Sequence, residues 1–453
     1  MLQMAVRTAI QLASIVDPGT RAARSVPVSR KQLQSGVALL AMLTLLTLWG
    51  LYLFLGQLSA RQLQMVREQS SAAAMASARE ALIGDAISAR SGDNPRPSIN
   101  DAGYLRLPDL GTGIGGAPAE GGAAGVLTDS GKDLSVIGKF PWKTLATEPL
   151  RDTQGECLWY VVAGRFQIAP KTDAPMNWDT QGQIDIIDRS GRIIARNLVA
   201  LIVAPGEPVD GQSRGLTDPT YEQCGGNYDA RNYLDAFDLA NAIANDVNYF
   251  PGSTNNRVAS DTINKQFVVA NTGHYNDRFL SITADEIFDR VIRRSDFATA
   301  IANLLDDPDL RKRAETGHPE TVAVSSGAGK EKGTDNLIGP NNLICNYIAD
   351  LNNREFCRNW WEMLFLTQLS TPSRITIDGN PAPLDCNRVL IFAGRKAGLQ
   401  TRSSVPEKRN KENYLESPNL ASFSVPSSTS SNFGGVSVFD WRNPGADIVR
   451  CLP

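Results

Sequence analysis

The residues whose chemistry is most readily anticipated are six cysteines. None stands in a Cys-x-x-Cys pair, the spacing that many structural zinc sites use, so zinc is not expected. In an exported domain an even number of cysteines predicts up to three disulfides, and buried free thiols are the alternative for some of them. The pairing is open, although a Cys345–Cys357 bond would tie one helical segment and a Cys386–Cys451 bond would hold the C-terminal tail. The candidates are Cys157, Cys224, Cys345, Cys357, Cys386 and Cys451.

Metal binding and acid–base catalysis have few other candidates. Hard cations prefer several oxygen ligands on one turn, and Asp306, Asp307 and Asp309 form the candidate calcium site. No EF-hand pattern surrounds them, and acidic turns also begin helices. The two histidines, His274 and His318, stand in polar stretches that predict surface positions, and no Gly-x-Ser-x-Gly elbow occurs. We therefore assign no catalytic residue and do not expect an enzyme; calcium is the only cofactor considered.

A glycine-rich run at 111–126 matches the dinucleotide-binding fingerprint in spacing only. The fingerprint needs a buried strand before it and a helix after it, and neither pattern flanks Gly111, Gly113 and Gly116. A flexible loop is the better interpretation. The net charge of -3 on 453 residues gives no electrostatic reason to expect nucleic acid as a partner.

The element that would position the rest of the chain is an apolar segment at residues 37–56. It contains no charge, and a helix of that length spans about 30 Å, the thickness of the bilayer hydrocarbon. A cleaved secretory signal is the alternative, but its apolar region would be shorter and nearer the N-terminus. The excess of basic residues before the segment predicts a cytoplasmic N-terminus and an exported main domain.

The same helix is predicted to continue beyond the apolar segment. Residues 57–87 contain no proline and one further internal glycine, Gly84, and Pro95 and Pro97 end the pattern. Strand-like runs then follow at 157–168, 184–195, 198–205 and 387–395, at spacings that favour an antiparallel sheet. Helices are predicted at 282–294, where Thr283 and Glu286 form a capping box, at 297–305 and at 343–369.

The N-terminal pattern resembles type IV pilin-like proteins and type II secretion pseudopilins. These proteins have a short basic leader, a glycine before the apolar span, and a long helix that is first anchor and then scaffold. Gly36 and Val37 match the leader-peptidase cut point. Ala41 stands at the fifth mature position, where most members have a glutamate, and this departure resembles the minor pseudopilin at the filament tip.

A second set of residues resembles a family of large pilin-like proteins. In that family a Pro-Trp motif precedes Leu-Arg-Asp, a glycine and a Leu-Trp-Tyr strand. Segments 201–214 and 276–294 also resemble it, whereas about 296–375 does not. The aromatic residues of the motif are expected in the core rather than on a binding platform. The matching residues are Pro141, Trp142, Leu150, Arg151, Asp152, Gly155, Leu158, Trp159 and Tyr160.

The resemblance implies an α+β fold, in which a long N-terminal transmembrane and scaffold helix packs on an antiparallel sheet. An additional helical region and a disulfide-tied C-terminal segment complete the chain. The expected divisions are a leader at 1–36, a transmembrane helix at 37–56, its periplasmic continuation at 57–92, a pilin-like domain at 93–295, a helical insertion at 296–375 and a β/loop segment at 376–453.

The resemblance also implies a function in assembly. The chain would be a minor, tip-type subunit of a type IV pilus or a type II secretion pseudopilus, held as a single-pass protein in the bacterial inner membrane. Its partners would be other pilin or pseudopilin subunits, the inner-membrane assembly platform and the leader peptidase. A membrane-anchored periplasmic binding or enzymatic domain with no filament role is the alternative, and leader processing would distinguish the two.

Overall fold

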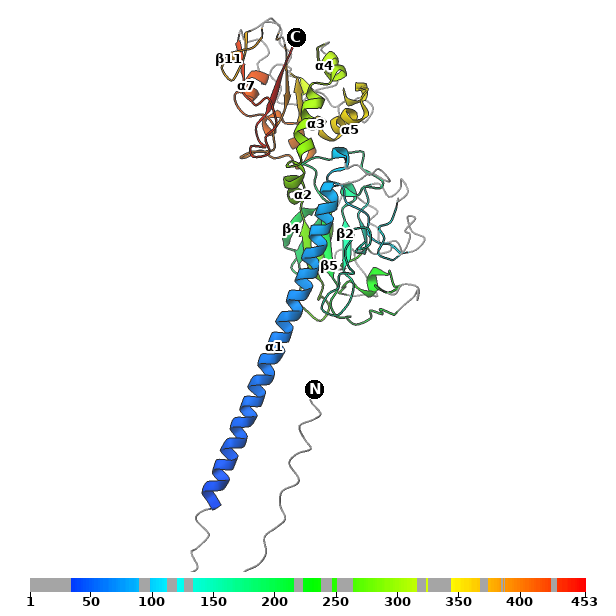
Figure 1. The fold of residues 1–453 in the computed structure, drawn as a ribbon, viewed down its shortest axis with the longest axis vertical. Coiled ribbons are helices and arrows are strands. Elements are labelled where there is room, and N and C mark those ends of the chain that lie inside the picture. Colours follow the sequence, from blue (N-terminus) through cyan, green and yellow to red (C-terminus); the bar gives the residue numbers. More distant parts are fainter. Residues whose placement is uncertain are drawn as a thin grey trace, which may run out of the picture. The chain divides into compact units, whose positions relative to one another are not determined.

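The computed structural model describes most of the chain (Figure 1). The chain divides into two units, Met1–Val66 and Arg67–Pro453, and each is described by itself. The described residues are 34–88, 98–111, 120–125, 133–215, 223–237, 247–250, 264–315, 323–324, 344–366, 374–383, 386, 388–424 and 430–453.

Helix α1 (Gln34–Ser88) confirms the single long helix that the sequence predicted. Within the second unit its buried residues recur at intervals of three or four positions, apart from the adjacent pair Leu82 and Ile83, which is the spacing of one helix face. That face joins the core, and the other faces of residues 67–88 are exposed or half-buried. The buried residues are Ser71, Met75, Ala78, Leu82, Ile83 and Ala86.

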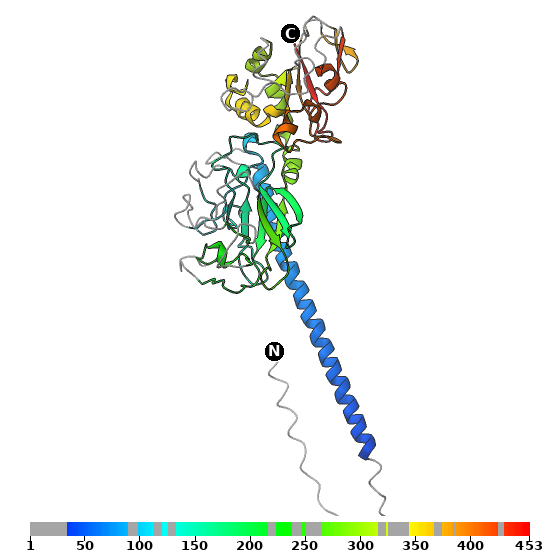
Figure 2. The ribbon, with the colours of Figure 1, turned by 180° about the vertical axis from the view of Figure 1, so that it is seen from behind.

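A four-stranded antiparallel sheet lies beside this part of α1 (Figures 1 and 2). Its order is β1 (Val136–Lys139), β2 (Trp159–Val162), β5 (Ala200–Ala204) and β7 (Arg278–Ile282). Every residue of β1, β2 and β5 is buried, because both faces of these strands are covered by protein. Trp159 and Tyr160 are fully buried in β2, as expected for core residues.

A second sheet has three strands in the order β4-β3-β6, and its strands alternate along the chain with those of the first sheet. The run predicted at 184–195 contains a turn at 189–191, and strands β3 (Ile184–Asp188) and β4 (Ile193–Leu198) form a hairpin around it. Strand β6 (Lys265–Val269) pairs parallel to β3, with Ile184 opposite Lys265. This pair departs from the antiparallel pattern expected from the short strand spacing, because its partner strand comes from a distant part of the chain.

Three helices follow β7. Helix α2 (Ala284–Val291) begins at the predicted capping box, in which the Thr283 side chain and the Glu286 side chain bind each other's backbone N–H. Helix α3 (Ser295–Leu305) was also predicted, and α4 (Pro308–Glu315) follows the acidic turn.

The C-terminal part of the chain forms its own mixed sheet, in the order β14-β12-β9-β8. The predicted helix at 343–369 is wrong in its last part, because Leu364–Leu366 forms strand β9 and pairs with β12. The bounds are β8 (Ala323–Val324), η7 (Ile344–Tyr347), α5 (Leu351–Trp360), η8 (Trp361–Met363), β9 (Leu364–Leu366), β12 (Arg388–Phe392) and β14 (Ile448–Leu452).

Smaller elements complete the described chain. A small sheet has the order β11-β10-β13, and β10 pairs parallel to β13. The bounds are η1 (Ile99–Asp101), η3 (Gly164–Phe166), η4 (Ala230–Asn232), β10 (Arg374–Ile377), β11 (Asn380–Pro381), α6 (Val405–Arg409), η9 (Lys411–Asn413), α7 (Asn419–Ser424) and β13 (Ser430–Phe433).

Three disulfides join all six cysteines. Two of them, Cys345–Cys357 and Cys386–Cys451, are the bonds that the sequence suggested. The third is Cys157–Cys224. The fold is therefore α+β with disulfide ties, as the sequence predicted in outline.

Candidate functional site

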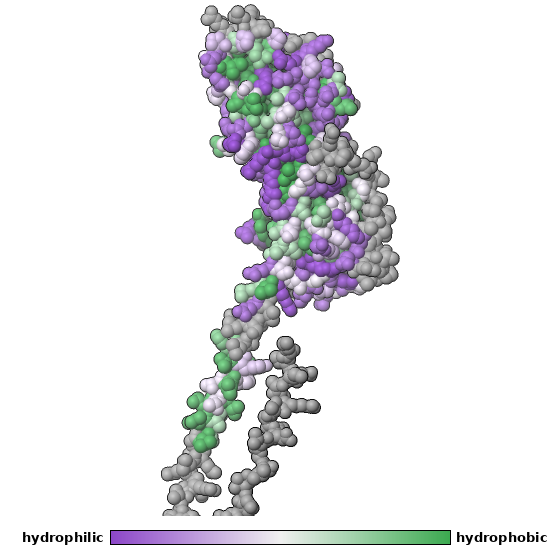
Figure 3. Space-filling model, in the orientation of Figure 1, coloured by the Kyte–Doolittle hydropathy of each residue, from purple (hydrophilic) through white to green (hydrophobic). Residues whose placement is uncertain are grey.

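The first part of α1 is a long, exposed apolar segment. Val37–Phe54 has a mean hydropathy of 2.2 and is long and apolar enough to cross a membrane. The lower part of the helix shows a hydrophobic surface in Figure 3. Every residue from Val37 to Phe54 is exposed, including Trp49 and Tyr52 at 64% and 74%. Soluble monomers rarely expose a continuous apolar surface of this size, so the segment is a candidate membrane span by its length and composition.

The polar groups inside this segment are compatible with lipid. The Thr44 hydroxyl donates to the Ala41 carbonyl at 2.9 Å, and the Thr47 hydroxyl donates to the Thr44 carbonyl at 2.9 Å. A hydroxyl that is hydrogen-bonded to the helix backbone does not need water, which lowers the cost of transferring it into hydrocarbon.

Both residues of the predicted processing junction lie at the start of α1. Gly36 and Val37 are helical, and Val37 is 67% exposed. The first turn of α1 contains no acidic residue, and Ala41 is exposed. The helix therefore carries no charged side chain from Gln34 to Phe54.

The second part of α1 is fixed to the globular unit by charge pairs as well as by its buried face. Arg290 of α2 donates to both carboxylate oxygens of Glu80, at 2.8 and 3.1 Å, and Arg79 pairs with Glu286. Hydrogen bonding from Arg290 lowers the pKa of Glu80. Arg106 pairs with Asp85 at 3.1 Å. The two Arg–Glu contacts hold α2 beside residues 79–80 of α1. Charge pairs of this kind occur in the second part of the helix, whereas residues 37–54 contain no charged side chain.

The motif residues around Asp152 build a turn. The Asp152 carboxylate accepts hydrogen bonds from the backbone N–H groups of Gln154, Glu156 and Gly206, at 2.9, 3.0 and 2.8 Å. Gly155 has φ of +86°, a conformation that favours glycine. The aspartate and glycine therefore have a structural role here, which is to join the turn before β2 to the loop after β5.

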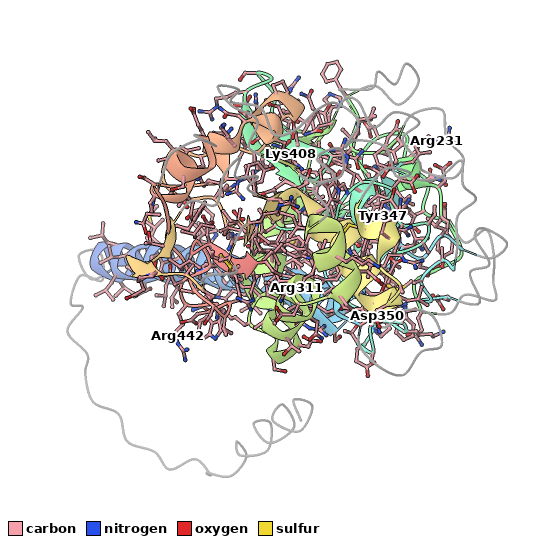
Figure 4. All side chains as sticks on the ribbon, turned by 90° about the horizontal axis from the view of Figure 1, so that it is seen from above. Arg231, Arg311, Tyr347, Asp350, Lys408 and Arg442 are labelled. Atoms are coloured by element: carbon pink, nitrogen blue, oxygen red, sulfur yellow. A yellow bond between two sulfur atoms is a disulfide. The ribbon has the colours of Figure 1, made fainter. Side chains whose placement is uncertain are left out.

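The three candidate calcium ligands each have a partner within the protein. Asp307 caps α4 by accepting from the N–H groups of Asp309 and Leu310, at 3.0 and 3.1 Å. Asp306 lies 3.5 Å from Arg311, which is labelled in Figure 4. Asp309 accepts from the Ala349 N–H at 2.9 Å. Among the described residues no group of three or more Asp, Glu, His or Cys side chains is arranged to hold a metal ion.

The histidines and the glycine-rich run lie on the surface or among the residues that the structure does not describe. His274 is exposed, as predicted, and its ring lies 5.2 Å from that of Phe237. Phe237, Arg189 and Tyr275 line a depression of about 370 Å³ beside β3 and β6. His318 and residues 112–119 and 126 of the glycine-rich run lie outside the described residues, whereas Gly111 has φ of +79°.

Two buried aspartates, Asp235 and Asp277, were not singled out from the sequence. They are 0% and 3% exposed and are held together by hydrogen bonds across 42 residues of chain. No local pattern could have revealed the pair, because the two residues come from separate segments that meet only in the folded chain.

Comparisons with known proteins add no relative: no family model, no curated protein and no solved structure matches the chain.

Proposed function

We propose that this chain is a minor, tip-type subunit of a type IV pilus or a type II secretion pseudopilus, which acts in filament assembly or initiation. The observation that carries the proposal is the division of α1. One part is apolar and exposed around its circumference, and the other is the scaffold of an α+β unit. A subunit that is stored in lipid and then assembles through its helix needs both parts.

The proposed mechanism is an exchange of apolar environments. Residues 37–54 first lie in the inner membrane, and leader-peptidase cleavage after Gly36 frees the helix start. The assembly platform then moves the helix from lipid to the helices of other subunits, where close packing takes the place of lipid contacts. Because Ala41 cannot form a charge contact with a neighbour's N-terminus, the subunit suits the tip, where no subunit stands ahead of it.

The proposed location is the bacterial inner membrane, with the N-terminus in the cytoplasm and the main unit in the periplasm. The basic flank before the apolar segment favours this orientation. The three disulfides support an oxidising compartment for the unit that contains them. An alkaline phosphatase fusion after residue 100 should be active; an inactive fusion there, with activity from an N-terminal fusion, contradicts the orientation.

Complementation tests the function. In a deletion strain, pilus or secretion output should be restored by the wild-type chain and by His274→Ala, and lost with Leu46→Arg. Leu46→Ala is the matched control for the position, because it shortens the side chain without placing a charge in the apolar segment. Loss of output with a His274→Ala chain that folds and inserts would favour the alternative, an anchored periplasmic binding or enzymatic domain.

A further inference from the structure

The depression of about 370 Å³ beside β3 and β6 has an apolar floor. Ile187 of β3 lies opposite Val268 of β6 in the parallel pair, and residues at the same register of adjacent strands face the same side of a sheet. Tyr275 packs with them, and the three side chains form a small hydrophobic cluster of their own. They are 6%, 4% and 2% exposed, so the floor is fixed by packing.

One wall of the depression is an aromatic ring with an arginine stacked on it. Phe237 is 48% exposed, and the Arg189 guanidinium lies 5.3 Å from the centre of its ring. Arg189 stands in the β3–β4 turn, where the Gly191 N–H donates to the Asp188 carbonyl at 2.9 Å. Stacking restrains the plane of the guanidinium and leaves the N–H groups at its edge able to donate to a ligand.

The positive charge of Arg189 is not balanced by an acidic side chain of the described residues. Asp188 also lines the depression, but its carboxylate accepts from the Arg192 guanidinium at 3.0 Å, which neutralises it. Gln266 adds a neutral amide to the lining. Within the described part of the chain, the Arg189 side chain has its contact with the ring and no ion pair or hydrogen bond. The rim therefore carries a net positive charge above an apolar floor.

We propose that this depression binds a small organic anion, in which a compact aromatic or branched aliphatic group is attached to a carboxylate. The apolar group would lie on the floor, and the carboxylate would accept from the edge of the Arg189 guanidinium, a pairing that suits the planar fork. Ligand sites of about 300–1,000 Å³ are mostly apolar with a few polar groups that fix orientation. A volume near the lower limit selects a compact ligand.

An ordinary surface contact is the competing explanation for the stacked arginine. The chain contains such a contact for comparison: the Arg293 guanidinium lies 5.0 Å from the ring of Trp441, which is 40% exposed. Neither of these residues lines the depression. The two stacks therefore differ in the apolar cavity beside Arg189, and the ligand is assigned to that cavity. This proposal is independent of the filament function.

Ligand-observed NMR of the full chain in detergent tests the site with phenylacetate as the probe. Phenylacetate should bind with a dissociation constant below about 10 mM, as expected for a ligand of this size. 2-Phenylethanol has the same ring without the charge, and 2-phenylethylamine has the opposite charge. Acetate has the charge without the ring. Each should bind at least about fivefold more weakly than phenylacetate, because each lacks one of the two contacts.

Two substitutions separate the cavity from stacking alone. Arg189→Gln and Phe237→Ala should each weaken phenylacetate binding about fivefold or more, since they remove the charge and the wall. Arg293→Gln is the matched control, because it removes the stacked arginine that has no part in the depression, and it should bind phenylacetate like the wild type. All three side chains are exposed, so the variants should keep the unfolding temperature of the wild type.

Three results overturn the proposal. The first is wild-type protein that shows no phenylacetate binding at concentrations up to about 10 mM. The second is equal binding of phenylacetate and 2-phenylethylamine, which would indicate contact of the ring with detergent or protein without recognition of charge. The third is a folded Arg189→Gln or Phe237→Ala chain that binds phenylacetate as tightly as Arg293→Gln does.

Discussion

The two parts of helix α1 have the same backbone structure and opposite side-chain environments. Residues 37–54 are uncharged and exposed all round, whereas from residue 67 to residue 88 one face is buried and the others carry charged residues, serines and alanines. A helix that is apolar on every face needs an apolar surrounding on every face; a helix with one apolar stripe needs only one packed neighbour. Packing against the rest of the described chain therefore explains the sequence pattern of residues 67–88, but it does not explain the apolar sequence of residues 37–54.

The largest expected effect comes from truncating the buried face. Leu82 is fully buried, so Leu82→Ala should lower the free energy of unfolding of the globular unit by about 2–5 kcal/mol. Leu48→Ala removes the same atoms from a side chain that is 63% exposed and should change it by less than about 0.5 kcal/mol. Chemical denaturation of both variants in detergent measures the difference. Equal losses would contradict the division of the helix.

The next effect tests whether the stability of the globular unit is separate from anchoring. The Cys157–Cys224 bond closes a loop of 67 residues, so replacing both cysteines by alanine should cost about 4 kcal/mol of unfolding free energy. The Cys345–Cys357 bond spans 12 residues, and its double alanine variant should cost about 3 kcal/mol. Both variants should remain in the membrane fraction. Release of either variant into the soluble fraction would show that the globular unit contributes to anchoring.

A charge in the apolar segment should weaken membrane insertion and leave the stability of the globular unit unchanged. Leu46→Arg should make membrane insertion less favourable by about 2.5–3.5 kcal/mol, since Arg at the centre of a transmembrane helix carries that cost on insertion scales. The globular unit should keep its unfolding midpoint. Flotation of membranes measures the first expectation and denaturation the second. Membrane association equal to that of Leu46→Ala would argue against lipid around this segment.

The smallest effect belongs to the ion pair on the outer side of α1. Arg290 lowers the pKa of Glu80, so this pair contributes stability above the ordinary pKa of 4.5 and loses it as the pH falls through the lower folded value. The pair is exposed, and Glu80→Gln should cost only about 0–1 kcal/mol at pH 7. The wild type and the variant should converge in stability at low pH. A difference that grows on acidification would contradict the assignment.

Features set by neighbouring residues could be predicted from the sequence. The apolar segment, the Thr283–Glu286 capping box and the β3–β4 hairpin each depend on a few consecutive residues, and the structure contains all three. Features set by distant residues could not be predicted. Leu364–Leu366 has an apolar composition that fits a helix as well as a strand, and pairing with β12 and β8 makes it a strand.

The candidate sites follow the same rule. The cysteines could be named from their type, but the Cys157–Cys224 bond joins residues that the sequence does not link. The acidic turn at Asp306 was visible because its residues are adjacent. The Asp235–Asp277 pair was invisible because it forms only when two loops meet.

The most direct test of the account is the N-terminus of the mature protein. Chain recovered from membranes of cells that contain the leader peptidase should be analysed by intact mass and N-terminal sequencing. The filament-subunit account predicts a chain that begins at Val37, with the mass of one added N-methyl group. A chain that retains residues 1–36, or one that is cut after the apolar segment, would contradict it.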